Sequence, residues 1–190
     1  MNLLNNRLSR YICNRARKGA VAIEFALSLP ILILLLLGGS DAAYMMIVAQ
    51  RVDRIAFSVT DIVTQSEMLT NADVNKILDA SSQLMSPFPF GSKGVVILSS
   101  IYKPQGAGAT IRWQRWGGGT LARTSKIGIQ GAVPSLPYGL TLLDNDNVII
   151  AEVYYDFSPL FMNAGILTRG DIYRVAVYKP RLSPLITPPS

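Results

Sequence analysis

The feature that most constrains this chain is an apolar stretch near its N-terminus, in which Glu24 is the only charged residue between Ala20 and Ser40. About 20 apolar residues in a helix are enough to cross a bilayer. Five cations and no acid precede this stretch: Arg7, Arg10, Arg15, Arg17 and Lys18. Because cytoplasmic flanks carry an excess of Lys and Arg, the sequence predicts a single-pass helix. The same charge asymmetry predicts that the N-terminus lies in the cytoplasm and that the remainder of the chain lies outside.

The basicity of the chain belongs to this N-terminal segment. The net charge is +6, but once the five leading cations are set aside, 13 Lys and Arg face 12 Asp and Glu. The body is therefore close to neutral, which argues against a nucleic-acid partner. The chain has no histidine, and its one cysteine, Cys13, lies among the leading cations. These absences remove a Ser-His-Asp triad and zinc sites built on His or Cys. We expect no enzyme activity, no cofactor and no metal.

Glu24 separates two interpretations of the apolar stretch. A secretory signal peptide would have a basic start, an apolar core over Phe25–Leu37 and a cut before Asp41. That interpretation gives Glu24 no role, although a charge in the middle of a span costs about 2.5–3.5 kcal/mol on insertion scales, and less near an end. Charged residues inside spans usually serve a function.

The residues around Glu24 supply such a function through a resemblance. The chain reads Arg17-Lys18-Gly19, then AVAI, then Glu24-Phe25, then an apolar run that contains Pro30. This pattern resembles type IV prepilins, and among them the TadE/TadF-like pseudopilins, or minor pilins, of the tight-adherence (Tad) pilus. The resemblance implies that a prepilin peptidase cuts between Gly19 and Ala20. It also implies that Glu24 and Phe25 act in assembly and registration, with Arg15, Arg17 and Lys18 as the charges of the leader.

The chemistry of such a cut explains the glutamate. Cleavage would create an α-amino group at Ala20, and that cation could pair with the Glu24 carboxylate of a neighbouring helix. A buried charge is tolerable when it has such a partner. The partners implied are the prepilin peptidase, other Tad pilins and pseudopilins, the assembly platform of the inner membrane, and membrane lipid. The expected location is the inner membrane, with the body in the periplasm or in a pilus fibre. An uncleaved membrane-anchored scaffold and a domain released by signal peptidase remain alternatives.

Past Ser40 the pattern predicts a helix that continues the span, with Gly38-Gly39 as the place for any bend. Apolar residues recur there at spacings of three and four, the stripe of an amphipathic helix: Val48, Val52, Ile55, Val59 and Ile62. We therefore divide the chain into a basic leader (1–19), a transmembrane helix (20–40), an amphipathic spine (41–66), an extracytoplasmic body (67–181) and a tail (182–190). The Pro-rich stretch from Pro180 onward is expected to be loose.

The body is predicted to be a short helix followed by an antiparallel sheet. Thr70 and Asp73 form a capping-box pattern before a helix that ends ahead of Pro87. Four strands are expected, at Gly94–Tyr102, Thr110–Trp116, Asn147–Phe157 and Ile172–Lys179. The stretches VYYDFSPLF (153–161) and YRVAVYKPR (173–181) resemble the closing strand pair of TadE/TadG-like proteins. The fold class is α+β, a long helix packed on a small sheet as in pilins.

Three other motifs are assigned structural roles. Asp144-Asn145-Asp146-Asn147 offers oxygen ligands but lacks the calcium-loop pattern, so we interpret it as a polar turn. Of Trp113 and Trp116, one is expected in the core and the other at an edge or a subunit interface. Strand alternation would put Ile111, Trp113 and Arg115 on one face and Arg112 on the other, which separates the cations that single-stranded nucleic acid would need. Gly117-Gly118-Gly119 lacks a P-loop pattern and is interpreted as a flexible loop.

Overall fold

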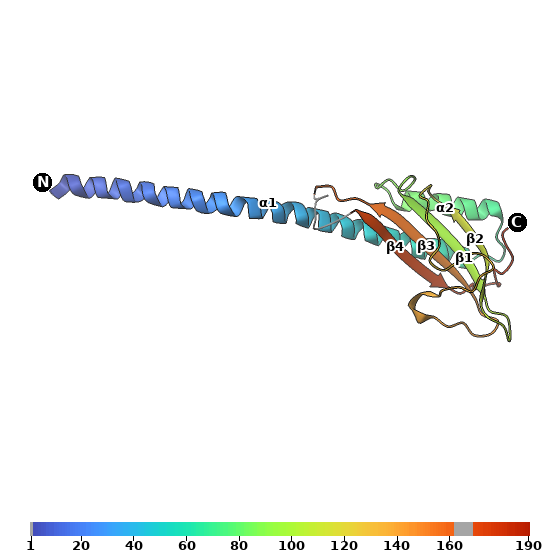
Figure 1. The fold of residues 1–190 in the computed structure, drawn as a ribbon. Helices are drawn as coiled ribbons and strands as arrows, with labels where there is room; N and C mark the ends of the chain where they lie inside the picture. The colour runs from blue at the N-terminus through green and yellow to red at the C-terminus, as the bar shows by residue number, and fades with distance from the viewer. Residues whose placement is uncertain (1, 162–168) are drawn as a thin grey trace.

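A single long helix projects from a compact α+β body (Figure 1). The computed structural model describes the backbone of residues 2–161 and 169–190, and the side chains of the described residues from Val21 onward. The body contains a second helix and a four-stranded antiparallel sheet. The α+β, pilin-like arrangement of a long apolar helix on a small sheet is thereby confirmed.

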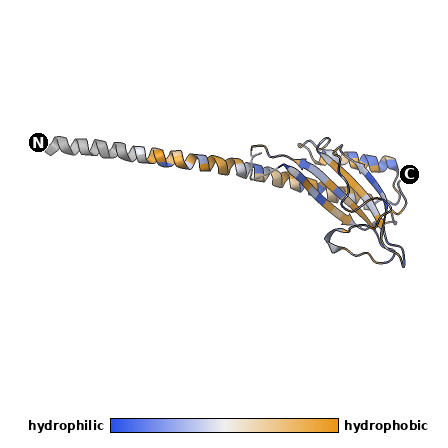
Figure 2. Cartoon of the chain, in the orientation of Figure 1, coloured by the Kyte–Doolittle hydropathy of each residue, from blue (hydrophilic) through white to orange (hydrophobic). Residues whose placement is uncertain are grey.

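Helix α1 extends from Asn2 to Thr64 without interruption. It continues through Pro30, although proline cannot donate a backbone hydrogen bond. It also continues as one helix through Gly38-Gly39, the place expected for any bend. Its N-terminal part stands clear of the body, and Figure 2 colours most of the described residues of this part as hydrophobic. Its C-terminal part lies against the sheet (Figure 1). The predicted span and spine are therefore consecutive parts of one helix.

The sheet has the strand order β2-β1-β3-β4, with every neighbouring pair antiparallel. Its strands are β1 (Gly94–Tyr102), β2 (Thr110–Gly117), β3 (Asn147–Phe157) and β4 (Gly170–Tyr178). The central strands β1 and β3 are buried along almost their whole length. Both faces of a central strand buried in this way must be covered. Helices α1 and α2 cover one face, and the connection from β2 to β3 covers part of the other.

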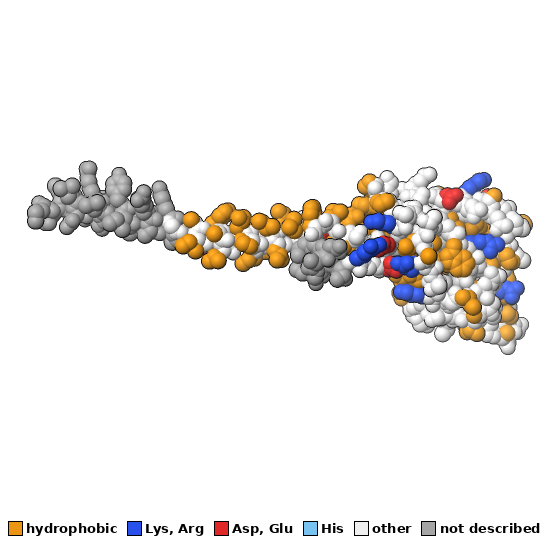
Figure 3. Space-filling view, turned by 45° about the horizontal axis from the view of Figure 1, so that its top comes forward, with side chains coloured by type: hydrophobic (Ala, Val, Ile, Leu, Met, Phe, Trp, Pro, Cys, Tyr) orange, Lys and Arg blue, Asp and Glu red, His pale blue; other side chains and the backbone are white. Residues whose placement is uncertain are grey.

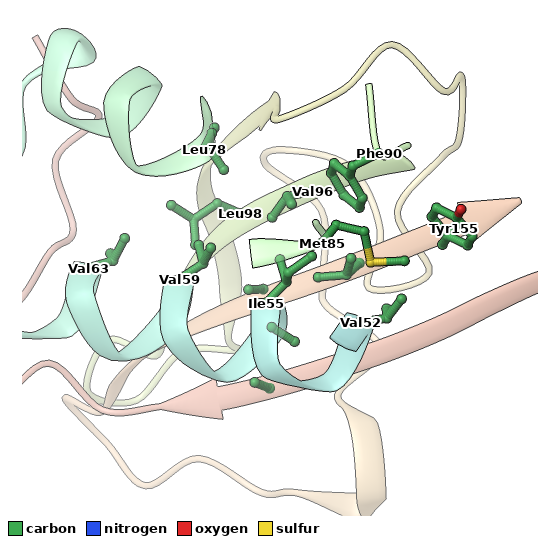
Figure 4. Close-up of a cluster of buried hydrophobic side chains, with 14 of the residues drawn as sticks. Val52, Ile55, Val59, Val63, Leu78, Met85, Phe90, Val96, Leu98 and Tyr155 are labelled. Carbon is green, nitrogen blue, oxygen red and sulfur yellow. The ribbon is translucent and has the colours of Figure 1, made fainter. Parts of the chain in front are cut away.

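The main core lies between α1, α2 and the sheet (Figure 4). Val52, Ile55 and Val59 of α1 are buried against it, as the stripe predicted. The stripe is wrong at its last member, because Ile62 is 49% exposed while Val63 is fully buried. Both residues continue a spacing of three or four from Val59, so only the position of the sheet decides between them.

Helix α2 (Asn71–Leu84) begins with the predicted capping box. The Thr70 hydroxyl oxygen accepts from the Asp73 backbone N–H at 3.2 Å, and the Asp73 carboxylate accepts from the Thr70 backbone N–H. These two bonds satisfy donors that have no partner inside the helix. The helix contributes Val74 and Leu78 to the main core.

The C-terminal tail is held by buried hydrogen bonds, so the prediction that it is loose is wrong. The Leu185 carbonyl accepts from Trp113 Nε1 at 2.9 Å and from Ser100 Oγ at 2.6 Å. The Leu185 N–H donates to Asn147 Oδ1 at 2.8 Å, and its side chain is only 5% exposed. Proline restricts the backbone of the undocked tail, so docking the tail costs less conformational entropy. The hydrogen-bond partners of Leu185 come from three strands of the sheet.

A β-bulge in β2 overturns part of the predicted alternation. Ser100 pairs with Trp113, but the next residue of β1, Ile101, pairs with Ile111, so Arg112 has no partner of its own. An extra residue of this kind reverses the facing of the residues beyond it. Trp113 therefore faces the helices while Ile111 faces the opposite side of the sheet.

Candidate functional site

The projecting part of α1 is the most unusual surface of the molecule. Within it, 18 consecutive residues have a mean hydropathy of 2.5, and none of them is buried. Among the described residues, α1 is the one helix long and apolar enough to cross a membrane. A surface of this size is stable in water only when a bilayer or other helices cover it. The single chain thus leaves its most apolar segment without a protein partner among the described residues.

Glu24 lies on this exposed segment. Val21, Glu24, Phe25 and Ser28 share one face of the helix and line a shallow depression. The Phe25 ring is 59% exposed, and the Ser28 hydroxyl donates to the Phe25 carbonyl at 3.2 Å. Within the part of the chain that the structure describes, no hydrogen bond or ion pair reaches the Glu24 carboxylate. Its carboxylate is therefore available to a partner outside the chain.

Gly19 is helical and open on all sides. A Cβ placed on it would meet no atom within 4 Å. The fold therefore has no need of glycine at this position, and any such need would come from a partner. The structure includes the backbone around the predicted cut in α1, whereas the side chains of Ala20, Arg15, Arg17 and Lys18 lie outside what it describes.

Asp41 is a second carboxylate on α1, and sequence reasoning missed its role. Its side chain is fully buried although it directly follows the apolar stretch. One carboxylate oxygen accepts from the backbone N–H of Leu160 at 2.8 Å, and both oxygens accept from that of Phe161 at 3.2 Å. The connection after β3 is therefore fixed to α1 at the residue where the apolar stretch ends.

Glu152 is a buried carboxylate on the other face of the sheet. It accepts from the Ser125 hydroxyl, from the Lys126 backbone N–H at 2.8 Å and from the Tyr173 hydroxyl at 3.0 Å. Burial, with the adjacent Glu152 charge, raises the pKa of Tyr154 to about 12 and that of Tyr173 well above its ordinary value. Because donors satisfy Glu152 on several sides, its role is to hold the β2–β3 connection against the sheet.

The other motifs have structural roles. Trp113 is fully buried and Trp116 is 50% exposed on edge strand β2, which agrees with the expectation of one core and one edge tryptophan. Asp144–Asn147 forms the predicted polar turn, with Asn145 at a φ of 67° and a bond from the Leu143 N–H to Asp146. Ion pairs with Lys103 and Lys179 lower the pKa of Asp144 and Asp146 respectively.

The interpretation of Gly117-Gly118-Gly119 as a flexible loop is wrong. A Cβ on Gly118 would collide with Ser81 and with the Leu78 carbonyl of α2, and one on Gly119 would collide with the Gly94 carbonyl. Gly118 also has a φ of 75°, a conformation that favours glycine. These glycines let the end of β2 pack closely against α2 and the start of β1.

Together, the long apolar helix and the helix-on-sheet body define a pilin-like α+β fold with one candidate membrane-spanning helix among the described residues. Residues 19–59 match the family model of TadE-like proteins, which confirms the predicted resemblance over this segment. The matched segment begins at Gly19 and includes Glu24, Phe25, Asp41 and the buried stripe of α1 as far as Val59. No curated protein and no solved structure matches the chain.

Proposed function

We propose that this chain is a minor pilin, or pseudopilin, required for assembly of a Tad-type pilus. In this proposal a prepilin peptidase removes residues 1–19, and the apolar part of α1 holds the mature subunit in the inner membrane. The body lies in the periplasm. The chain is a substrate of the peptidase and has no enzymatic role of its own.

One observation carries the proposal: α1 has an apolar segment with no buried residue, within a family match that begins at Gly19. The helix is continuous with the spine of the body, so a force or contact applied to the apolar part reaches the sheet through one rigid element. A pilus subunit needs this continuity, because its helix packs with other helices while its body stays outside. The size of the sheet body suits a low-copy position at the fibre tip or in the assembly platform.

Glu24 provides the proposed register between subunits. After cleavage the new α-amino group at Ala20 is one helical turn from Glu24 along the sequence, so a neighbouring helix shifted by about 6 Å would bring the two charges together. Pairing removes most of the cost of a charge in a poorly hydrated bundle. The absence of a Glu24 partner among the described residues of the single chain is in keeping with this role.

The experiment that tests the proposal is the intact mass and N-terminal sequence of the protein extracted from membranes. A mature chain that begins at Ala20 supports the pseudopilin. A chain that begins at Asp41 would make it a secreted domain, and an intact Met1 would make it an uncleaved anchor. Co-expression without the peptidase is the control, since the precursor should then persist.

A second measurement separates a fibre subunit from a scaffold. The protein is quantified in sheared fibres and in the inner membrane of the same cells. Its presence in fibres at low copy supports a minor pilin. Its complete absence from fibres, with fibres lost on deletion, would make it a scaffold of the assembly machine.

A further inference from the structure

We infer that the segment directly after β3, residues 158–161, contacts the membrane surface through Leu160 and Phe161, so that the body binds lipid in addition to being attached to α1. This inference rests on the membrane anchoring proposed above. It assigns a lipid-contact surface in the body, separate from the span itself.

The first support is the position of the connection along α1. Asp41 accepts hydrogen bonds from the backbone of both Leu160 and Phe161. Leu37 is the last residue of the apolar run, four residues earlier, which corresponds to about 6 Å along a helix. The headgroup layer of a bilayer extends about 5–7 Å beyond its hydrocarbon on each side. In a membrane-inserted chain, Leu160 and Phe161 would therefore lie at the depth of the lipid headgroups.

The second support is the chemistry of the two side chains. Leu160 is 62% exposed and Phe161 is 59% exposed, although backbone bonds fix both residues. The protein thus holds two large apolar side chains in the open. They belong to the segment that follows β3, and Figure 1 shows the end of β3 on the side of the body from which α1 projects. Aromatic and aliphatic side chains at this depth bury their surface in the boundary between headgroups and acyl chains.

The third support is the charge beside them. Figure 3 shows Lys and Arg side chains at this end of the body, close to α1. Lys93 donates to Ser158 at 3.2 Å, two residues before Leu160. Arg169 pairs with Asp156 yet keeps 67% of its side chain exposed. Cations next to an apolar tip are suited to lipid phosphates.

The test uses the full chain in vesicles of phosphatidylethanolamine and phosphatidylglycerol. Cys13 is first replaced by Ser, and single cysteines are then introduced for a nitroxide label by Phe161→Cys, Leu34→Cys or Met68→Cys. Accessibility to oxygen, which concentrates in lipid, is compared with accessibility to a water-soluble nickel chelate. Met68 is the matched control in the body, because it is 85% exposed and lies at the far end of the spine.

We expect the Phe161 label to lie at a shallow depth in lipid, with nickel accessibility several-fold below that of the Met68 label. Adding Asp41→Ala should raise the nickel accessibility of the Phe161 label, because the connection is released. A Phe161 label as open to nickel as the Met68 label would overturn the inference. A label closed to both reagents and broadened by a second spin would also overturn it, in favour of a contact between copies. The Leu34 label tests the anchor separately: if it lies in water, the proposed anchoring itself has failed.

Discussion

Replacing Leu185 by alanine should destabilise the body strongly, although Leu185 belongs to a tail that composition alone describes as loose. The side chain is 5% exposed and packs in the main core. Deleting a buried leucine side chain to alanine costs about 2–5 kcal/mol in unfolding free energy, through lost burial and the cavity left behind. Leu182 is the matched control, since it lies three residues earlier and is 61% exposed. Leu182→Ala should change stability by no more than about 0.5 kcal/mol.

A truncation after Leu182 should cost more than Leu185→Ala does. The alanine variant keeps the backbone of residue 185, and with it the bonds from Trp113, from Ser100 and to Asn147. The truncation removes all three and leaves buried polar groups without partners. Each such group costs about 1–3 kcal/mol, so the total loss approaches the whole stability of an ordinary domain, about 5–15 kcal/mol.

The assay is urea unfolding of the full chain in a mild non-ionic detergent, followed by tryptophan fluorescence. Both tryptophans of the chain lie in β2, so the signal reports the body and not α1. With a urea slope of about 2 kcal/mol/M, Leu185→Ala should lower the midpoint by about 1–2.5 M. Equal midpoints for Leu185→Ala and Leu182→Ala would refute the docked tail and the reasoning drawn from it.

Three further predictions follow from α1 and from the surface ion pairs. Gly19→Val should fold normally, because a side chain there has open space, but should leave the 19-residue leader attached; normal maturation, seen by mass, would reject the proposed cut. Glu24→Gln should be cleaved and membrane-inserted but recover fewer pilin partners on co-purification, and unchanged recovery would remove Glu24 from assembly. The hydrogen-bonded Arg123 guanidinium lowers the pKa of Asp171. Since the folded-state pKa is below the unfolded one, this pair stabilises the body above about pH 4 and less as the pH falls further. Arg123→Gln should flatten the acid side of the urea-midpoint profile, and an unchanged profile would contradict the pairing.

The architecture could be predicted from the sequence because its elements are locally encoded. The predicted bounds of β1 and β3 agree with the structure, since both strands are apolar runs bounded by turn residues. The errors arise where tertiary context decides. Ile62 and Val63 are both apolar and adjacent, so the helix period alone could not show which of them faces the core. The bulge at Arg112 interrupts the alternation of faces in β2. No residue type in this strand would have predicted a bulge at that position.

The candidate site was predictable to the extent that it is short-range. The proposed cut, the apolar run and Glu24 lie within one continuous stretch of sequence, so the proposal for them needs only neighbouring residues. The role of Asp41 was not predictable in this way. Its partners are backbone N–H groups 119 and 120 residues away. Every residue except proline has such a group, so the sequence does not show which of them will bind Asp41. The docked tail was missed for the same reason, because its acceptor is the carbonyl of Leu185.

Glu24 and Asp41 show how one helix can carry two carboxylates with separate roles. They are 17 residues apart on α1, about 26 Å along its axis, near opposite ends of the apolar stretch. Asp41 is buried and bonded to the body, so its loss should alter how the body sits above the helix. Glu24 is exposed, and its carboxylate makes no hydrogen bond or ion pair with a described residue, so its loss should leave the folded subunit unchanged. A carboxylate without a polar partner among the described residues, in a segment where charge is costly, is what the proposed contact with a neighbouring subunit would explain.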